Sequence, residues 1–329
     1  MIKFFSDIKA INPLALLGFL ICVRVFFLIG YLGDIAWQPT AQNYTDFIFS
    51  ILNQNQYVAF LLSTGIVYLS ALFLNNMMVQ HEILFRRNFL GAYFFCLIAS
   101  IYPEYYLLGS PILVTFLMII SMQKLFELYK VPYPFDNIFL TGILTGFCVL
   151  LNLSFIVMLV FMLIGIMFFR AIKFKEIMAA LLGFALPIFI AFVLNYLLND
   201  VFFPEYLNFP SFDTKNILFQ ILYSPFPYIT LIAVLASIRI VSNYWRNTIK
   251  TRRIIILIYF YLAIALLLTF TGNENPLQES LLCALPLSII LAHYYTVDNQ
   301  LKWYRKLMHI LLLVIVFVFQ FKFLWIGLI

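Results

Sequence analysis

Charged residues are scarce in this chain: Asp, Glu, Lys and Arg make up 10% of its 329 residues, while hydrophobic residues make up 64%. Soluble domains carry about 25% charged residues, so a water-soluble fold is excluded and the lipid bilayer is the expected solvent. The 12 glycines form no Gly-rich phosphate-binding loop. The basic residues form no groove interleaved with stacking aromatic residues, so nucleic acid is not an expected partner.

Cysteine and histidine are also few. The four cysteines lie inside or at the edge of apolar runs without paired spacing, which supports neither a disulfide framework nor a zinc site. The three histidines have no metal-ligand spacing, and we expect interfacial or packing roles for them. These residues are Cys22, Cys96, Cys148 and Cys283, and His81, His293 and His309.

Long polar connections are missing as well. The largest, over residues 37–57 and 200–216, are about twenty residues long, which is too short for a soluble domain. The first apolar run reaches Gly33 and is too long for the core of a signal peptide. No small-residue cleavage site follows it, so we expect it to be retained as a membrane span. We therefore predict one transmembrane domain over residues 1–329 and no soluble domain.

Apolar runs recur along the whole chain, and about 20 residues are needed to cross a bilayer as a helix. The runs predict an all-α, polytopic transmembrane helix bundle of about eleven spans, with ten as the alternative. The third to sixth runs are short and closely joined, which is compatible with tilted or partly re-entrant segments. The runs cover residues 11–32, 57–79, 88–103, 108–123, 137–151, 153–170, 177–198, 222–242, 254–271, 278–296 and 307–327.

The basic residues are concentrated on one side of this alternation. Sixteen of the 20 Lys and Arg residues lie in the N-terminal segment or in every second connection, whereas the opposite connections contain Lys215 and eight acidic residues. The positive-inside rule makes the basic side cytoplasmic. We therefore predict a bacterial inner-membrane protein with a cytoplasmic N-terminus and a periplasmic C-terminus. The net charge of +6 then reflects topology and attraction to anionic membrane lipids.

Arg24 is not explained by topology, because it lies inside the first apolar run, about 12 Å below the outer end of the expected helix. An arginine near the centre of a span costs roughly 2.5–3.5 kcal/mol on insertion scales, so it needs a partner or a water-filled cavity. The structural interpretation is a pairing with a carbonyl or carboxylate inside the bundle. The functional one is a contact to a lipid phosphate or substrate, for which five donors are well suited.

Two acidic residues are expected near the same outer surface. Asp34 closes the first apolar run, and Glu104 lies in the sequence Tyr-Pro-Glu-Tyr-Tyr at the outer end of the third run. Each could be a solvated acid at the membrane interface. Alternatively, Asp34 could act as a general base toward an acceptor hydroxyl, and the two acids could share a divalent cation.

The order of Arg24 in the first span, Asp34 directly outside it and Glu104 in the next outer loop resembles the GT-C membrane glycosyltransferases, which use polyprenyl-phosphate-linked sugars. The resemblance implies that Asp34 is the base or a metal ligand, Glu104 the second acid and Arg24 a phosphate contact. A divalent cation would be the cofactor of such a site. In this chain Ile35 follows Asp34, where many members of that group carry a second acid, and the long first outer loop of many members is missing.

The GT-C resemblance covers residues 1–200, the first seven spans, most closely from about residue 10, and includes the Gly-containing segments 141–146 and 182–184. Four further spans, over residues 201–329, lie beyond it. The whole chain is also similar to an uncharacterised family of multi-pass inner-membrane proteins of Bacteroidota, through residues 86–88 and 180–187.

Two functions are compatible with these features. The absence of a strong catalytic constellation and the very apolar, aromatic surface favour a non-catalytic membrane subunit or partner of a cell-envelope assembly or secretion complex. The alternative is a glycosyltransferase that uses an undecaprenyl-phosphate-linked sugar at the outer face of the inner membrane. A transporter is a third interpretation, because Pro187 and Pro286 could mark broken helices, but the chain shows no matching halves.

Overall fold

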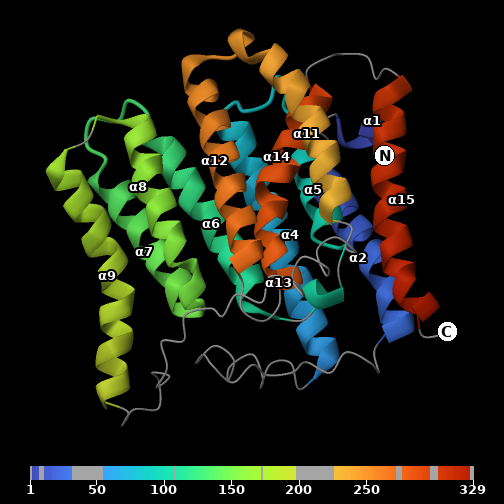
Figure 1. Ribbon diagram of the computed structural model, residues 1–329, viewed down its shortest axis with the longest axis horizontal. Coiled ribbons are helices and arrows are strands. Elements are labelled where there is room, and N and C mark those ends of the chain that lie inside the picture. Colours follow the sequence, from blue (N-terminus) through green and yellow to red (C-terminus); the bar gives the residue numbers. More distant parts are fainter. Residues whose placement is uncertain are drawn as a thin grey trace.

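The computed structural model describes residues 2–6, 11–31, 55–101, 103–106, 108–171, 173–197, 226–271, 276–296 and 303–326. Within these ranges the chain is helical and contains no strand, which confirms the all-α prediction (Figure 1). The α-helices are α1 (Ile2–Phe5), α2 (Asn12–Tyr31), α4 (Gln56–Gln80), α5 (Leu90–Ile98), α6 (Ser110–Glu127), α7 (Phe135–Leu151), α8 (Val157–Phe169), α9 (Phe174–Leu197), α11 (Phe226–Ser242), α12 (Ile249–Thr271), α13 (Pro276–Glu279), α14 (Ala284–Thr296) and α15 (Trp303–Ile326). Four short 3-10 helices, η1 (Pro103–Tyr106), η2 (Leu153–Ile156), η3 (Tyr244–Arg246) and η4 (Ser280–Cys283), lie between them.

Each predicted apolar run coincides with a helix, although the ends differ by a few residues. In the described part of the chain, four helices are long and apolar enough to cross a membrane, namely α4, α6, α9 and α12. Shorter apolar helices cover Asn12–Arg24, Phe135–Leu151, Leu153–Phe169, Pro227–Ser242 and Ser280–Thr296. The described part of the chain is thus helical with four candidate membrane spans, and the count of eleven stays a prediction.

Helix α5 departs most from the predicted span over residues 88–103, because it covers only Leu90–Ile98. Nine residues give roughly 13 Å of helix, less than half of the ~30 Å hydrocarbon core of a bilayer. All nine residues are buried, so α5 is a core helix. An apolar run indicates burial, but it does not distinguish burial in protein from burial in lipid.

Helices α5 and α14 form the centre of the bundle and pack against each other. All 13 residues of α14 are buried, as expected for a helix that is apolar on every side. Figure 1 shows α7, α8 and α9 on one flank and α1, α2 and α15 on the other, with α4, α6 and α12 between them. The other helices therefore surround α5 and α14, a pair of short helices enclosed by protein.

Local sequence signals set several helix ends. The Asn55 side chain accepts a hydrogen bond from the backbone N–H of Tyr57 and caps α4. Thr248 does the same for α12, because its Oγ1 accepts from the N–H of Thr251 at 3.3 Å. Beyond the C-termini of α4 and α6, Glu82 and Lys130 adopt positive φ angles of 49° and 63°, which stop the helices in left-handed turns.

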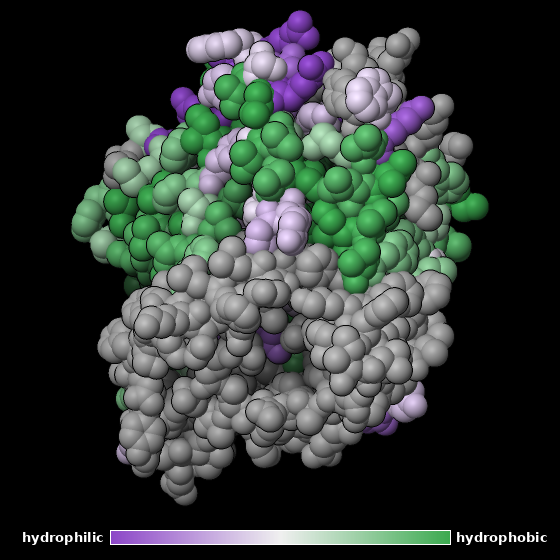
Figure 2. Space-filling model, turned by 45° about the vertical axis from the view of Figure 1, so that its right-hand side comes forward, coloured by the Kyte–Doolittle hydropathy of each residue, from purple (hydrophilic) through white to green (hydrophobic). Residues whose placement is uncertain are grey.

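The connections rich in Lys and Arg lie at one end of the bundle. The α4–α5, α6–α7, α8–α9 and α11–α12 connections are at the top in Figure 1, and the N-terminus lies at the same end. Figure 2 shows hydrophilic residues gathered at this end above a band of hydrophobic residues. This end, which we call the basic end, is the one that the positive-inside rule assigns to the cytoplasm.

Helices α7 and α9 approach each other more closely than side chains would permit. A Cβ atom added at Gly142 would lie 2.4 Å from the carbonyl oxygen of Ala180, and one at Gly183 would lie 2.3 Å from that of Phe139. A Cβ at Gly146 would lie 2.5 Å from the carbonyl oxygen of Phe184. Backbone-to-backbone packing on small residues is typical of helix pairs in membranes. These glycines, from the two segments noted in the sequence, are therefore packing residues.

Candidate functional site

Arg24 lies in α2 and is fully buried, with none of its side chain exposed to solvent. Its NH2 donates to the carbonyl of Ala99 at 2.9 Å, and its NH1 donates to Thr64 Oγ1 at 3.0 Å. Longer contacts of 3.4 Å join Nε to Ser100 Oγ and NH1 to Ser63 Oγ. The guanidinium group therefore joins α2 to α4 and to the turn that follows α5.

The groups around Arg24 are themselves held in place. Ser63 donates to the carbonyl of Tyr106 at 2.7 Å, and the Tyr106 hydroxyl donates to the carbonyl of Ser100 at 2.8 Å. The guanidinium carbon of Arg24 lies 4.9 Å from the centre of the Tyr106 ring, a distance at which a cation is attracted to the ring face. We call Arg24, Ser63, Thr64, Ser100 and Tyr106 the Arg24 cluster.

The charge of Arg24 is stabilised by hydroxyl and carbonyl dipoles and by the ring of Tyr106. No carboxylate from the described residues forms an ion pair with Arg24. Arginine has five N–H donors, and four hydrogen bonds to protein atoms engage most of them. Of the two sequence-based interpretations, the contacts match the structural one, in which a carbonyl inside the bundle pairs with Arg24.

The two predicted acids can be placed only in part. Asp34 lies outside the described residues. Glu104 belongs to η1. The structure describes the backbone of η1, and the side chain of Glu104 lies outside the described residues. Because Tyr106 of the same short helix contacts Arg24, the structure brings the Glu104 segment beside the Arg24 cluster.

A buried acid, Glu279, lies near this segment; in the sequence it is one of the eight acidic residues of the connections opposite the basic ones. It ends α13 and is 6% exposed, and its Oε2 has no hydrogen-bond partner among the described residues. The neighbouring Ser280 forms a hydrogen bond with Tyr105 of η1. A third carboxyl group thus lies close to the segment of Glu104, and no local sequence signal distinguishes it from the solvated acids of the outer loops.

The basic end also holds charges that the sequence does not mark as special. Arg305 is fully buried, with its guanidinium carbon 5.2 Å from the centre of the Tyr294 ring. Arg170 forms an ion pair of 3.4 Å with Glu176, which is 2% exposed, and also donates to the carbonyl of Val131. These arginines hold neighbouring segments together in addition to their role in topology.

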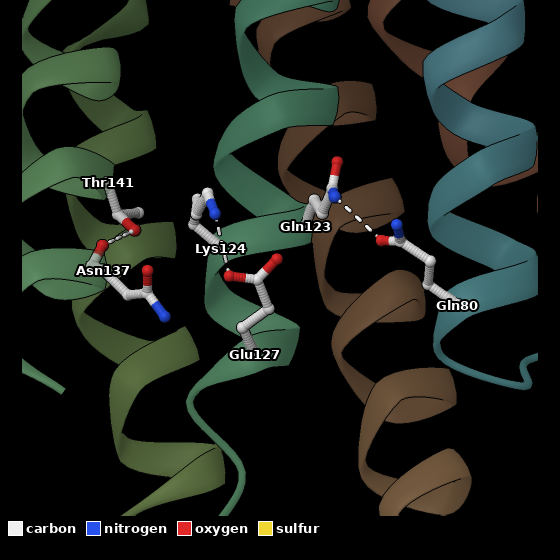
Figure 3. Close-up of polar contacts among 6 residues, drawn as sticks. All are labelled: Gln80, Gln123, Lys124, Glu127, Asn137 and Thr141. Carbon is white, nitrogen blue, oxygen red and sulfur yellow. Dashed lines mark hydrogen bonds and ion pairs between the residues drawn. The ribbon is translucent and has the colours of Figure 1, made fainter. Parts of the chain in front are cut away.

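Weaker polar contacts lie between and within the neighbouring helices (Figure 3). Gln123 of α6 donates to Gln80 of α4 at 2.9 Å, and Lys124 pairs with Glu127 within α6 at 2.8 Å. Thr141 donates to the carbonyl of Asn137 within α7. The Gln123–Gln80 bond is exposed, the Lys124–Glu127 pair is part-buried, and an ion pair with such solvent access contributes at most about 1 kcal/mol. We assign all three contacts a structural role.

His81 follows the last residue of α4 and contacts Lys250 of α12, with 3.1 Å between Nδ1 and Nζ. Burial, together with the Lys250 charge, lowers the pKa of His81 to about 4. Because a lysine ammonium can only donate, the contact requires an unprotonated Nδ1. This matches the packing role expected for His81.

Acidification is therefore expected to destabilise the protein through His81. Between about pH 6.5 and pH 4 the unfolded chain binds a proton at His81 that the folded chain does not bind, so this part of the stability is complete above about pH 6.5 and decreases as the pH falls. We expect the midpoint of heat denaturation to fall more steeply with decreasing pH in wild type than in His81→Gln. Equal slopes for the two proteins would contradict the prediction.

Within the ranges that the structure describes, no three His, Cys, Asp or Glu side chains lie close enough together to hold a metal ion. Asp34 is outside those ranges, so the divalent cation implied by the GT-C resemblance stays a prediction.

A family model matches residues 47–327 of the chain, and its description is "Family of unknown function (DUF6427)". The chain belongs to the DUF6427 family. The match in this DUF6427 protein includes Glu104, Glu279 and the whole α11–α12 connection, whereas Arg24 and Asp34 precede it. The comparisons with curated proteins and with solved structures give no match.

Proposed function

We propose that this DUF6427 protein is a non-catalytic membrane subunit of a cell-envelope assembly or secretion complex. It would form a single transmembrane domain in the bacterial inner membrane, with its N-terminus in the cytoplasm and its C-terminus in the periplasm. The observation that carries this proposal is that Arg24 is hydrogen-bonded to groups inside the bundle. The side chain best suited to bind a substrate phosphate uses its donors on Thr64 and Ala99 inside the bundle.

The outer flank of α9 supports a role in lateral association. This helix packs mainly on α7 through the glycines described above, and much of its remaining surface is apolar and is not covered by the residues that the structure describes. Phe189 and Phe192 are 66% and 60% exposed. In a membrane such a face contacts lipid or the transmembrane helix of a partner, and interfaces of the second kind rely on van der Waals packing of the side chains.

Cross-linking from α9 tests this proposal. A photoreactive phenylalanine analogue at Phe189 or Phe192 is expected to give a discrete higher-mass adduct in native membranes, and the same partner should co-purify stoichiometrically in mild detergent. The analogue at the fully buried Phe161 is the control and should give no adduct. A protein that purifies alone and forms only lipid adducts would contradict a subunit role.

A glycosyltransferase that uses a polyprenyl-phosphate-linked sugar is the second candidate. It is favoured by the contact between the Arg24 cluster and η1, the helix that carries Glu104. In this function Asp34 is the base, Glu104 the second acid, and a divalent cation is shared between them. If Asp34→Asn and Glu104→Gln proteins abolish an envelope glycan while remaining folded, catalysis is supported. Full activity of both would remove this candidate.

A further inference from the structure

A cavity of about 280 Å³ opens at the basic end, between two segments that are far apart in the sequence. One wall is the turn that follows α4, with Glu82, Arg86 and Arg87. The other wall is η3 and the start of α12, with Arg246, Asn247, Thr248 and Thr251. Small-molecule sites usually begin near 300 Å³, so the volume suits a small group such as a phosphate.

The charge of the lining is strongly positive. Three arginines and one acid give a formal charge of 3 − 1 = +2. The side chains of Arg86, Arg87 and Arg246 form no hydrogen bond or ion pair with the residues that the structure describes. Two arginines just beside the cavity differ in this respect. Arg252 lies over the Trp245 ring and donates to the carbonyl of Asn247, and Arg253 donates to the carbonyl of Phe168.

A buried amide also lacks a partner in this cavity. Asn247 lines the cavity and is 8% exposed, yet its Nδ2 has no hydrogen-bond partner among the described residues. A buried donor without an acceptor costs about 1–3 kcal/mol, so an acceptor in the cavity would remove that cost. The positive end of the α12 dipole lies beside it, since Thr248 caps this 23-residue helix.

Topology alone does not explain this arrangement. The positive-inside rule requires basic residues in the cytoplasmic connections, but it requires neither their convergence on a cavity nor an unpaired amide next to them. We propose that the cavity binds a phosphate-bearing anion, either the phosphate of an anionic lipid headgroup in the cytoplasmic leaflet or a free phosphate or pyrophosphate. The exposed Trp245 beside the cavity is a residue typical of the headgroup level of a bilayer.

Binding to the full-length protein in a neutral detergent tests the proposal. The probes are dioctanoyl phosphatidylglycerol, dioctanoyl phosphatidylcholine, inorganic phosphate and pyrophosphate, each titrated by calorimetry at low and moderate salt. Wild type is expected to bind phosphatidylglycerol or pyrophosphate, and phosphatidylcholine at least about tenfold more weakly, because a zwitterionic headgroup offers no net charge to the arginines.

The cavity variant is Arg86→Gln/Arg87→Gln/Arg246→Gln, and the matched control is Lys173→Gln/Lys175→Gln/Lys306→Gln, which removes the same charge at exposed residues outside the cavity. We expect the cavity variant to bind at least about tenfold more weakly and the control to stay within about twofold of wild type. Asn247→Leu provides a test that leaves every charge in place, and it should also weaken binding.

The outcomes separate the sources of the anion. Binding of phosphatidylglycerol without the free anions identifies a lipid site, and binding of phosphate or pyrophosphate alone identifies a soluble ligand. The proposal is overturned if wild type binds none of the anions, or if the control loses as much affinity as the cavity variant, since the attraction would then belong to the surface as a whole.

Discussion

Replacing Arg24 with alanine is expected to lower the free energy of unfolding by about 2–5 kcal/mol, the range for emptying a large buried site. The substitution also leaves the Ala99 carbonyl without the 2.9 Å bond from Arg24. Ser63 and Ser100 lose less, because both hydroxyls keep backbone carbonyls as acceptors. An arginine in lipid also raises the free energy of the chain that is inserted but not yet packed. Removing Arg24 therefore does not compensate for the lost free energy of unfolding.

Arg24→Met separates the two contributions. Methionine fills much of the volume and is expected to cost only the carbonyl bond, about 1–3 kcal/mol. Denaturation of the purified protein in detergent measures both variants, with Cys22→Ala on the exposed side of the same helix as the control. Equal stability of Arg24→Ala and wild type would show that the Arg24 cluster does not hold α2 in place.

The double substitution Gly142→Ala/Gly183→Ala is expected to displace α9 from α7. Each new methyl group would lie within 2.4 Å of a backbone carbonyl oxygen on the other helix, and a backbone cannot move away as a flexible side chain can. Overpacking costs about 1–3 kcal/mol at a single site. Because α9 has few other contacts in the bundle, displacement of the whole helix is the expected response.

Spin labels at Tyr133 and Phe174, which are exposed next to α7 and at the start of α9, would report the displacement as a longer and broader distance distribution. Gly65→Ala is the matched control, because a Cβ there meets nothing within 4 Å. Alanine favours a helix over glycine by up to about 1 kcal/mol, so the control should be as stable as wild type or slightly more stable. An unchanged distance in the double variant would contradict the close packing of α7 and α9.

The sequence predicts the main helices well because each of them coincides with a long apolar run. It overestimates the length of α5, since the predicted run over residues 88–103 holds a helix of only Leu90–Ile98, and hydropathy does not distinguish burial in protein from burial in lipid. It treats Arg170 and Arg305 as charges of the cytoplasmic connections, whereas Arg305 is fully buried and Arg170 is half-buried and pairs with the buried Glu176. Burial of a polar residue depends on which helices meet, and a single sequence does not contain that information.

The candidate site, like the fold, was predictable in part from the sequence. Arg24 stands out because an isolated charge in an apolar run requires an explanation, and the structure supplies partners from α4 and the turn after α5. The convergence of Arg86 and Arg246 on one cavity was not predictable, because 160 residues separate them in the sequence. Local charge counting records both residues and leaves their proximity unknown.

The contact between α5 and α15 bears on how the protein is made. Tyr93 and His309 are 216 residues apart, and 2.8 Å separates the Tyr93 hydroxyl from Nε2 of His309. The ring of Phe5 stacks on Tyr93, so three segments from the beginning, the first third and the end of the chain share one aromatic cluster. The residues of α1 and α5 are synthesised well before those of α15, so this cluster can close only after the last helix has been made. A chain truncated before α15 would lack His309, so the Tyr93 hydroxyl would lose its hydrogen bond and the cluster would stay open.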